Sequence, residues 1–251
     1  MHSDILALSV TALALGTIHT ALGPDHYLPF VMMARAGAWS VKRTALVTFL
    51  CGLGHVASSV VLGGVGLMAG VLVGRLESIE AVRGDFAAFL LIVFGLAYMI
   101  WGLVRAARDR AGHAHAHVHQ DDGVVHVHSH DHAAEHRAEG ALRGHGHTHK
   151  VAGPPAARIL TPWVLFTIFV FGPCEPLIPL LMYPAAESNF AGALAVAAVF
   201  SAATIGTMLV IVLVLYAGLK GLRLGALERY SHAVAGFAVA ACGAAILFLG
   251  L

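Results

Sequence analysis

Six side chains that can ligate a metal or move a proton lie inside long apolar stretches of the sequence. They are His19, Asp25, His26, His55, Cys174 and Glu175. Because an ionisable group is costly inside a bilayer, its default interpretation is a step in an ion or substrate pathway. Imidazole, carboxylate and thiolate together favour Ni²⁺, Co²⁺ or Zn²⁺, whereas Mg²⁺ and Ca²⁺ prefer all-oxygen cages. The sequence therefore predicts a transition-metal site within the membrane.

Three of these residues also have a structural interpretation. His55, alone on an apolar helix, is typical of an interhelical hydrogen bond, and His19 fits either role. Cys174 fits a small, inert core residue equally well. Asp25 and His26 are different, because two adjacent polar side chains at a helix interruption seldom serve packing.

A second group of metal-ligating residues lies in a polar linker, residues 106–158, which holds twelve of the seventeen histidines. Neutral imidazoles spaced this closely bind Ni²⁺, Co²⁺, Cu²⁺ or Zn²⁺. The linker has almost no large apolar residues, so we expect it to be disordered until it binds an ion, and to bind several ions weakly. Its interspersed acidic residues and central position argue against an engineered tag. The predicted accessory ligands are His113, His115, His117, His119, His126, His128, His130, His132, His145, His147 and His149.

The composition requires membrane-spanning elements to position these groups. The chain of 251 residues is 58% hydrophobic and only 12% charged, with a mean hydropathy of +0.80. These values exclude an ordinary soluble domain, and a net charge of +1 gives no reason to expect a nucleic-acid partner. Six apolar segments are long enough to span a bilayer, at roughly 5–33, 44–73, 84–105, 159–183, 190–217 and 232–251. The predicted fold class is an all-α integral membrane protein with six transmembrane helices.

The distribution of lysine and arginine predicts the orientation of these helices. One side carries nearly all the basic loop residues, whereas the other has only Arg75 and Arg83, offset by Glu77 and Glu80. Since basic loops stay in the cytoplasm, the chain is expected to be a multi-pass protein of the cell membrane with both termini outside and the histidine-rich linker inside. The basic side comprises Arg35, Lys42, Arg43, Arg105, Arg108, Arg110, Arg158, Lys220, Arg223 and Arg229.

A short internal repeat relates the two halves of the chain. GPDHYLP at 23–29 matches GPCEPLIP at 172–179, which aligns Asp25 with Cys174 and His26 with Glu175. Each half has three spans, so the second must be inverted relative to the first, as in many transporters. We therefore divide the chain into a first repeat at 1–105, the linker at 106–158 and a second repeat at 159–251. Matches this short can also arise by chance.

Prolines predict that the first and fourth helices are broken. Each proline removes a backbone donor, and such breaks deep in a membrane occur where they line a cavity or are buried in protein. Simple packing kinks are the alternative. His19 and His26 would lie roughly 10 Å apart on a continuous helix, so only a break brings them together. The prolines concerned are Pro24, Pro29, Pro173, Pro176 and Pro179.

The motif HTALGPDH, residues 19–26, resembles the histidine-x4-aspartate-histidine signature of nickel/cobalt transporters, with one extra residue before Asp25. The six spans, the GPCEPLIP break and the histidine-rich loop look more like the smaller members of that superfamily, the nickel/cobalt efflux proteins and urease-accessory membrane proteins. The resemblance implies metal ligation by His19, Asp25 and His26, with His55 as a further candidate.

Two other classes of membrane protein fit part of the sequence. A transmembrane thiol relay has proline-flanked cysteines in both halves, but the position that matches Cys174 is Asp25, so a resolving thiol is lacking. A sulfite or organic-anion exporter can bind anions at the broken helix ends, yet it has no use for a histidine tract.

We therefore predict a transporter, not an enzyme, that carries divalent transition-metal ions, with Ni²⁺ or Co²⁺ as substrate. The sequence leaves the direction of transport open, with efflux favoured. No permanently bound cofactor is expected. The expected partners are the bilayer and the ions, with a cytoplasmic metal-delivery protein as a further candidate.

Overall fold

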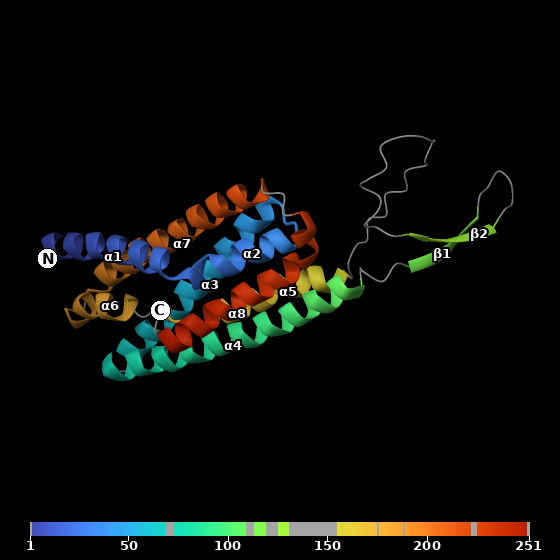
Figure 1. Cartoon of the computed structure of the whole chain (residues 1–251). Helices are drawn as coiled ribbons and strands as arrows, with labels where there is room; N and C mark the ends of the chain where they lie inside the picture. The colour runs from blue at the N-terminus through green and yellow to red at the C-terminus, as the bar shows by residue number, and fades with distance from the viewer. Residues whose placement is uncertain are drawn as a thin grey trace.

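The computed structural model describes residues 2–68, 73–108, 113–118, 125–130, 155–174, 176–187, 189–221 and 225–249. Helices dominate this part of the chain (Figure 1). Their order is α1 (His2–Leu22), η1 (Pro24–His26), α2 (Leu28–Ala36), α3 (Val41–Met68), α4 (Val73–Arg108), α5 (Pro155–Phe171), α6 (Leu177–Ala186), α7 (Phe190–Lys220), η2 (Gly225–Tyr230) and α8 (Ser231–Leu249).

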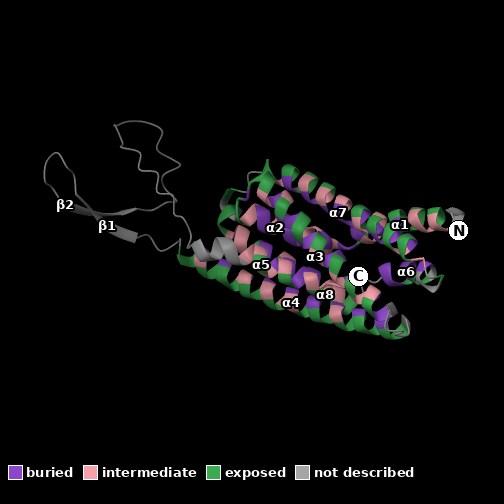
Figure 2. Cartoon of the chain, turned by 180° about the vertical axis from the view of Figure 1, so that it is seen from behind, coloured by how far each residue is buried: buried purple, intermediate pink, exposed green. Residues whose placement is uncertain are grey.

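Five helices, α1, α3, α4, α7 and α8, are long and apolar enough to cross a membrane. Many large apolar residues of these helices are exposed, and exposed residues are green in Figure 2. Contact with lipid accounts for such an apolar surface better than contact with water does. The fourth predicted segment is divided between α5 and α6. The described helices therefore indicate a multi-pass membrane protein.

The first predicted break is confirmed between α1 and α2. Helix α1 ends at Leu22, and Pro24 begins the single 3₁₀ turn η1. Pro29 lies in the first turn of α2, where a missing backbone donor costs nothing. The two prolines thus end one helix and begin the next within the same predicted span.

The second predicted break is confirmed between α5 and α6. Pro173 and Pro176 lie between the end of α5 at Phe171 and the start of α6 at Leu177. Pro179 is accommodated in the first turn of α6, as Pro29 is in α2. A proline in the first turn of the following helix explains why a new helix starts soon after each break, at Leu28 and at Leu177.

The expected loop between the second and third segments is wrong in its extent, because α4 begins at Val73 and includes Arg75, Glu77, Glu80 and Arg83. Glu80 is fully buried and forms an i,i+3 ion pair with Arg83, so two opposite charges neutralise one another within the helix. Arg83 is therefore a helix residue that contributes nothing to the loop charge.

Within the linker the structure describes two short strands. Strands β1 (His113–Val118) and β2 (Val125–His130) pair antiparallel. The alternation of histidine with alanine or valine is a strand pattern. The register places the histidines of the two strands opposite one another: His113 faces His130, His115 faces His128 and His117 faces His126. His119, His132, His145, His147 and His149 lie outside the described residues.

Helix α2 lies at the centre of the larger hydrophobic core. Phe30, Val31 and Ala34 are fully buried there against residues of α5, α7 and α8. The hydroxyl of Tyr216 in α7 donates to the carbonyl of Trp39, which follows α2. The second half of the first broken helix is thereby fixed, so the turn before it has a defined position.

Helices α4 and α8 approach closely at glycines. A Cβ atom on Gly95 would lie 2.7 Å from the Gly236 carbonyl oxygen, and one on Gly236 would lie 2.6 Å from that of Gly95. Small residues allow this backbone contact, which supports packing in a membrane without a hydrophobic driving force.

Gly95→Ala is expected to destabilise the protein by about 1–3 kcal/mol, because neighbouring backbone cannot yield to the added methyl group. Gly206→Ala is the matched control, since a Cβ atom there meets nothing within 4 Å. Thermal unfolding in detergent compares the two. Equal melting temperatures for both variants would show that the α4–α8 contact is looser than described.

Candidate metal centre

Three histidines from separate parts of the fold meet at the first break. His19 lies in the last turn of α1, His26 lies in η1 and His55 lies in α3. One ring nitrogen from each lies within 4.8 Å of the other two. The ring centroids of His19 and His26 are 4.7 Å apart, and those of His26 and His55 are 5.2 Å apart. The break thus brings His19 and His26 together, beside His55 of α3.

The backbone of the first break is held by local hydrogen bonds. The N–H of Gly23 donates to the His19 carbonyl over 3.0 Å, and the N–H of His26 donates to the Gly23 carbonyl over 3.1 Å. A Cβ atom on Gly23 would lie 2.6 Å from His26 Nδ1 and 2.8 Å from Asp25 Oδ1. Glycine is therefore required at position 23 because the Asp25–His26 pair folds back onto this residue.

Hydrogen bonds from the Nδ1 atoms orient two of the three rings. Asp25 Oδ1 lies 3.0 Å from His26 Nδ1, and the Phe169 carbonyl oxygen lies 3.3 Å from His55 Nδ1. Since a carbonyl can only accept, His55 Nδ1 must donate, which leaves the lone pair on Nε2. A histidine that ligates a metal usually donates its other N–H to a carboxylate or carbonyl in this way.

The Nε2 atoms of all three histidines are buried without a hydrogen-bond partner among the described residues. Unpartnered buried nitrogens are uncommon because each costs the free energy of its lost hydration. An ion bound by imidazole lies about 2.1 Å from each nitrogen, which sets ligand atoms about 3–3.5 Å apart. The separation of up to 4.8 Å is compatible with closure of the three rings around one ion.

A cavity of about 580 Å³ opens beside the three histidines. It is lined by residues of both breaks, including Gly23 and Asp25 at the first and Pro173 and Pro176 at the second. It extends along α4 to the exposed Asp85. The charged side chains among its described lining residues are the two carboxylates, with no lysine or arginine, so the cavity attracts cations.

Of the two ligands predicted at the second break, the structure describes Cys174, and it does not place Cys174 in this centre. The Cys174 side chain is fully buried in a hydrophobic cluster with Leu177 and Phe200, and is not part of the histidine group. This burial agrees with the alternative interpretation of Cys174 as a small core residue. Glu175 lies outside the described residues.

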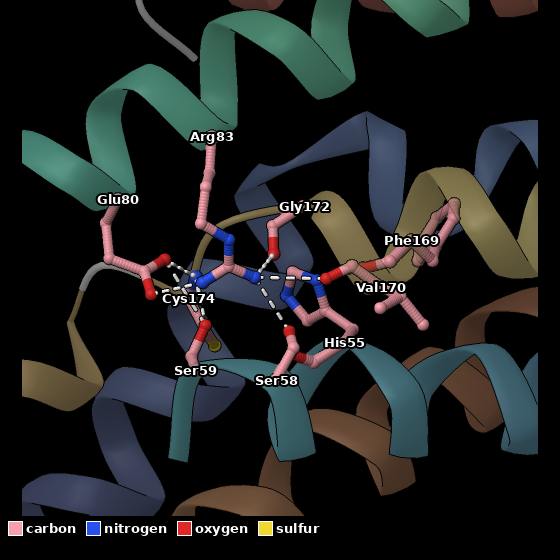
Figure 3. Close-up of polar contacts among 9 residues, drawn as sticks. All are labelled: His55, Ser58, Ser59, Glu80, Arg83, Phe169, Val170, Gly172 and Cys174. Carbon is pink, nitrogen blue, oxygen red and sulfur yellow. Dashed lines mark hydrogen bonds and ion pairs between the residues drawn. The ribbon is translucent and has the colours of Figure 1, made fainter. Parts of the chain in front are cut away.

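Sequence analysis missed a buried polar network beside the second break (Figure 3). It joins Glu80 and Arg83 of α4 to Ser58 and Ser59 of α3. The i,i+3 spacing of Glu80 and Arg83 was a usable signal, but we interpreted both as loop residues that balance charge. The pattern that identifies such an ion pair is an acidic and a basic residue three positions apart, with an apolar helix that continues through both.

Comparison of the chain with family models, curated proteins and solved structures finds no match.

Proposed function

We propose that this protein transports divalent transition-metal ions, Ni²⁺ or Co²⁺, across the membrane, with efflux as the favoured direction. The observation that carries the proposal is the convergence of three buried, unpartnered imidazole nitrogens of His19, His26 and His55 at a helix break beside a cavity. Asp25 completes a set of nitrogen and oxygen donors suited to these ions. These metal ions are the substrate of the proposed transporter, which needs no permanently bound cofactor.

The charge of the cavity favours a cation over an anion as substrate. A sulfite or organic-anion exporter needs positive side chains or free backbone N–H groups aimed at the substrate. Here the carboxylates of Asp25 and Asp85 line the cavity instead. A carboxylate beside three imidazoles binds a metal ion and repels an anion.

The buried cysteines also give no support to a thiol relay. Cys51, Cys174 and Cys242 are free and buried. A relay needs an accessible thiolate and a second thiol to resolve the mixed disulfide. Burial of all three thiols favours the transporter.

Packing within the bundle supports the proposed architecture of six spans in two inverted repeats. The offset that relates Gly95 to Gly243 also relates Ala88 to Gly236. Gly95 lies against Gly236, and a Cβ atom on Gly243 would lie 2.5 Å from the Ala88 carbonyl oxygen. The Gly95–Gly236 contact therefore corresponds to the Gly243–Ala88 contact when the two repeats are exchanged. A two-fold axis between the repeats requires this correspondence. Likewise, α1 packs on α7, and α5 packs on α3.

In this architecture each broken helix counts as one span, and the histidine-rich linker lies in the cytoplasm. The N-terminus and the end of α4 that leads into the linker lie at opposite ends of the bundle (Figure 1). The basic residues Arg105 and Arg108 are in the last turn of α4, on the linker side. Both observations agree with an outside N-terminus and a cytoplasmic linker.

Transport by the purified protein in lipid vesicles tests the proposal directly. We expect accumulation of Ni²⁺ or Co²⁺ above that of protein-free vesicles, without accumulation of sulfite. Metal content of cells with and without the protein gives the direction, since lower content means efflux. Sulfite transport without metal transport would replace this proposal with the anion exporter.

Deletion of residues 113–149 is expected to leave the transport rate at saturating metal within about twofold of the intact protein, while raising the metal concentration needed for half-maximal transport. The linker can concentrate ions, but the proposed pathway lies in the helices. Vesicle transport over a range of Ni²⁺ concentrations measures both quantities. Loss of all transport by the inserted, folded deletion variant would place the linker in the pathway.

A further inference from the structure

The buried ion pair Glu80–Arg83 satisfies the backbone groups that the second break sets free. Arg83 Nη2 donates to the Val170 carbonyl over 3.0 Å and to the Gly172 carbonyl over 3.4 Å. On the other side of the break, the Cys174 N–H donates to Glu80 Oε2 over 3.3 Å. The carbonyls at the end of a helix have no partner within it, and a cation is favourable there.

The same pair is tied to α3 through two serines. Arg83 Nη2 donates to Ser58 Oγ over 2.8 Å, and Ser59 Oγ donates to Glu80 Oε2 over 3.3 Å. The Glu80 side chain is fully buried, and 17% of the Arg83 side chain is exposed. Burying such a pair is costly unless every polar atom is satisfied, and here the guanidinium and carboxylate contact groups from three parts of the chain (Figure 3).

The network around Glu80 and Arg83 contacts the segment that packs against the His55 ring. The Phe169 carbonyl that accepts from His55 Nδ1 precedes Val170, whose carbonyl Arg83 binds. A Cβ atom on Gly172 would lie 3.0 Å from His55 Nδ1, so the chain at 169–172 is in contact with the ring. Ser58, which accepts from Arg83, in turn donates to the His55 carbonyl over 2.8 Å. The position of His55 thus depends on a segment that Arg83 and Glu80 hold.

The two sides of the metal centre therefore differ in how they are held. The turn that carries His26 is closed by its own backbone, through bonds among residues 19–27. The segment at 169–172, which orients His55, is instead held by hydrogen bonds from a separate helix, α4. A change in α4 can consequently move His55 without altering His19 or His26.

We propose that Glu80 and Arg83 are positioning residues that set the affinity of the centre for metal by fixing the ring of His55. This inference rests on the proposed function, since it assigns their role to the same metal centre. The pair is not itself a ligand, because Arg83 is a cation and the Glu80 oxygens are taken by Arg83, Ser59 and the Cys174 N–H.

Equilibrium binding of Co²⁺ to the purified full chain tests the proposal without requiring transport. The linker also binds metal, so the His26→Asn variant, which keeps the linker intact, supplies the background. The difference in bound Co²⁺ between the two titrations is the binding by the membrane centre. If the native protein and His26→Asn bind identically, no such centre exists and the proposed function fails with it.

The decisive variant is the double replacement Glu80→Gln with Arg83→Gln, which removes both charges and leaves neither buried alone. We expect the affinity of the membrane centre to fall about tenfold to a hundredfold, as loss of groups that orient ligands typically does, with no change in linker binding. Glu77→Gln with Arg75→Gln is the matched control, because both residues are exposed on the same helix. Native affinity in the folded Glu80/Arg83 double variant would overturn the proposal while leaving the proposed function intact.

Two further measurements separate positioning from general stability. Arg83→Lys keeps the charge but loses the planar fork, so we expect partial retention of affinity. On a His55→Asn background, Arg83→Lys should cause no further loss, because its effect passes through that ring. Equal losses on both backgrounds would contradict the proposal. If the double variant does not fold, Ser59→Ala removes one partner of Glu80 without stranding a charge, and unchanged affinity in that variant would likewise overturn it.

Discussion

His26→Asn and Asp25→Ala are each expected to reduce metal transport in vesicles at least a hundredfold, while the protein still inserts and folds. The His26 Nε2 atom is one of three convergent, unpartnered imidazole nitrogens that we propose as ligands, and its Nδ1 is oriented by Asp25 at 3.0 Å. Asparagine at position 26 fits the turn but offers no imidazole lone pair. Alanine at position 25 removes both the carboxylate in the cavity and the group that orients the ring.

His232→Asn is the matched control for this experiment. His232 is also a helix histidine with a defined hydrogen bond, between its Nδ1 and the Tyr98 hydroxyl at 2.8 Å, but it is not part of the histidine group. It should transport at near the native rate. Near-native transport by both His26→Asn and Asp25→Ala would mean that the ion does not pass through this centre.

The loss in these variants should be selective for metal. Both residues line the cavity, so a general collapse of the cavity would also affect stability. Melting temperatures measured in detergent, with and without Co²⁺, separate the two effects: the native protein should be stabilised by the ion, because the ion binds only the folded state. His26→Asn should lose most of this stabilisation and keep the metal-free melting temperature within a few degrees.

Prediction from sequence succeeded where a single residue type determines the outcome. Proline has no N–H and disfavours continuation of a helix, so both breaks were predictable from Pro24 and Pro173, although Pro162 is accommodated within α5 and Pro184 within α6. The nearness of His19 and His26 followed, since a break between them is the only way to bring together groups seven residues apart. Long apolar segments likewise gave the helices, although the start of α4 was missed.

Prediction failed where the partner of a residue is distant in the chain. Glu80 and Arg83 look like loop charges until the backbone of residues 170–174 is placed beside them. The local sequence does not indicate that the end of α5 packs against α4. The same limit applies to Cys174, which aligns with Asp25 in the repeat but is buried among apolar side chains. A repeat aligns backbone positions, and it does not make the side chains at those positions serve the same role.

Gly23→Ala is expected to lower metal transport tenfold or more with little loss of stability, which makes it the sharpest test of the geometry. Gly23 has φ −84° and ψ 100°, a backbone conformation that alanine adopts freely, so no strain arises from the chain itself. The effect of the added Cβ atom is purely steric. It would lie 2.6 Å from His26 Nδ1 and 2.8 Å from Asp25 Oδ1, so the Asp25–His26 pair must move.

Alanine variants at two other glycines provide transport rates with which the Gly23→Ala rate is compared. Gly206→Ala, which meets nothing within 4 Å, should transport normally. Gly172→Ala places a Cβ atom 3.0 Å from His55 Nδ1, so it should give a smaller loss than Gly23→Ala, since one ring is displaced by less. Initial rates of Ni²⁺ transport in vesicles measure the order. If Gly23→Ala transports as well as Gly206→Ala, the Asp25–His26 pair does not need its present geometry, and the three histidines are not the ligands of the transported ion.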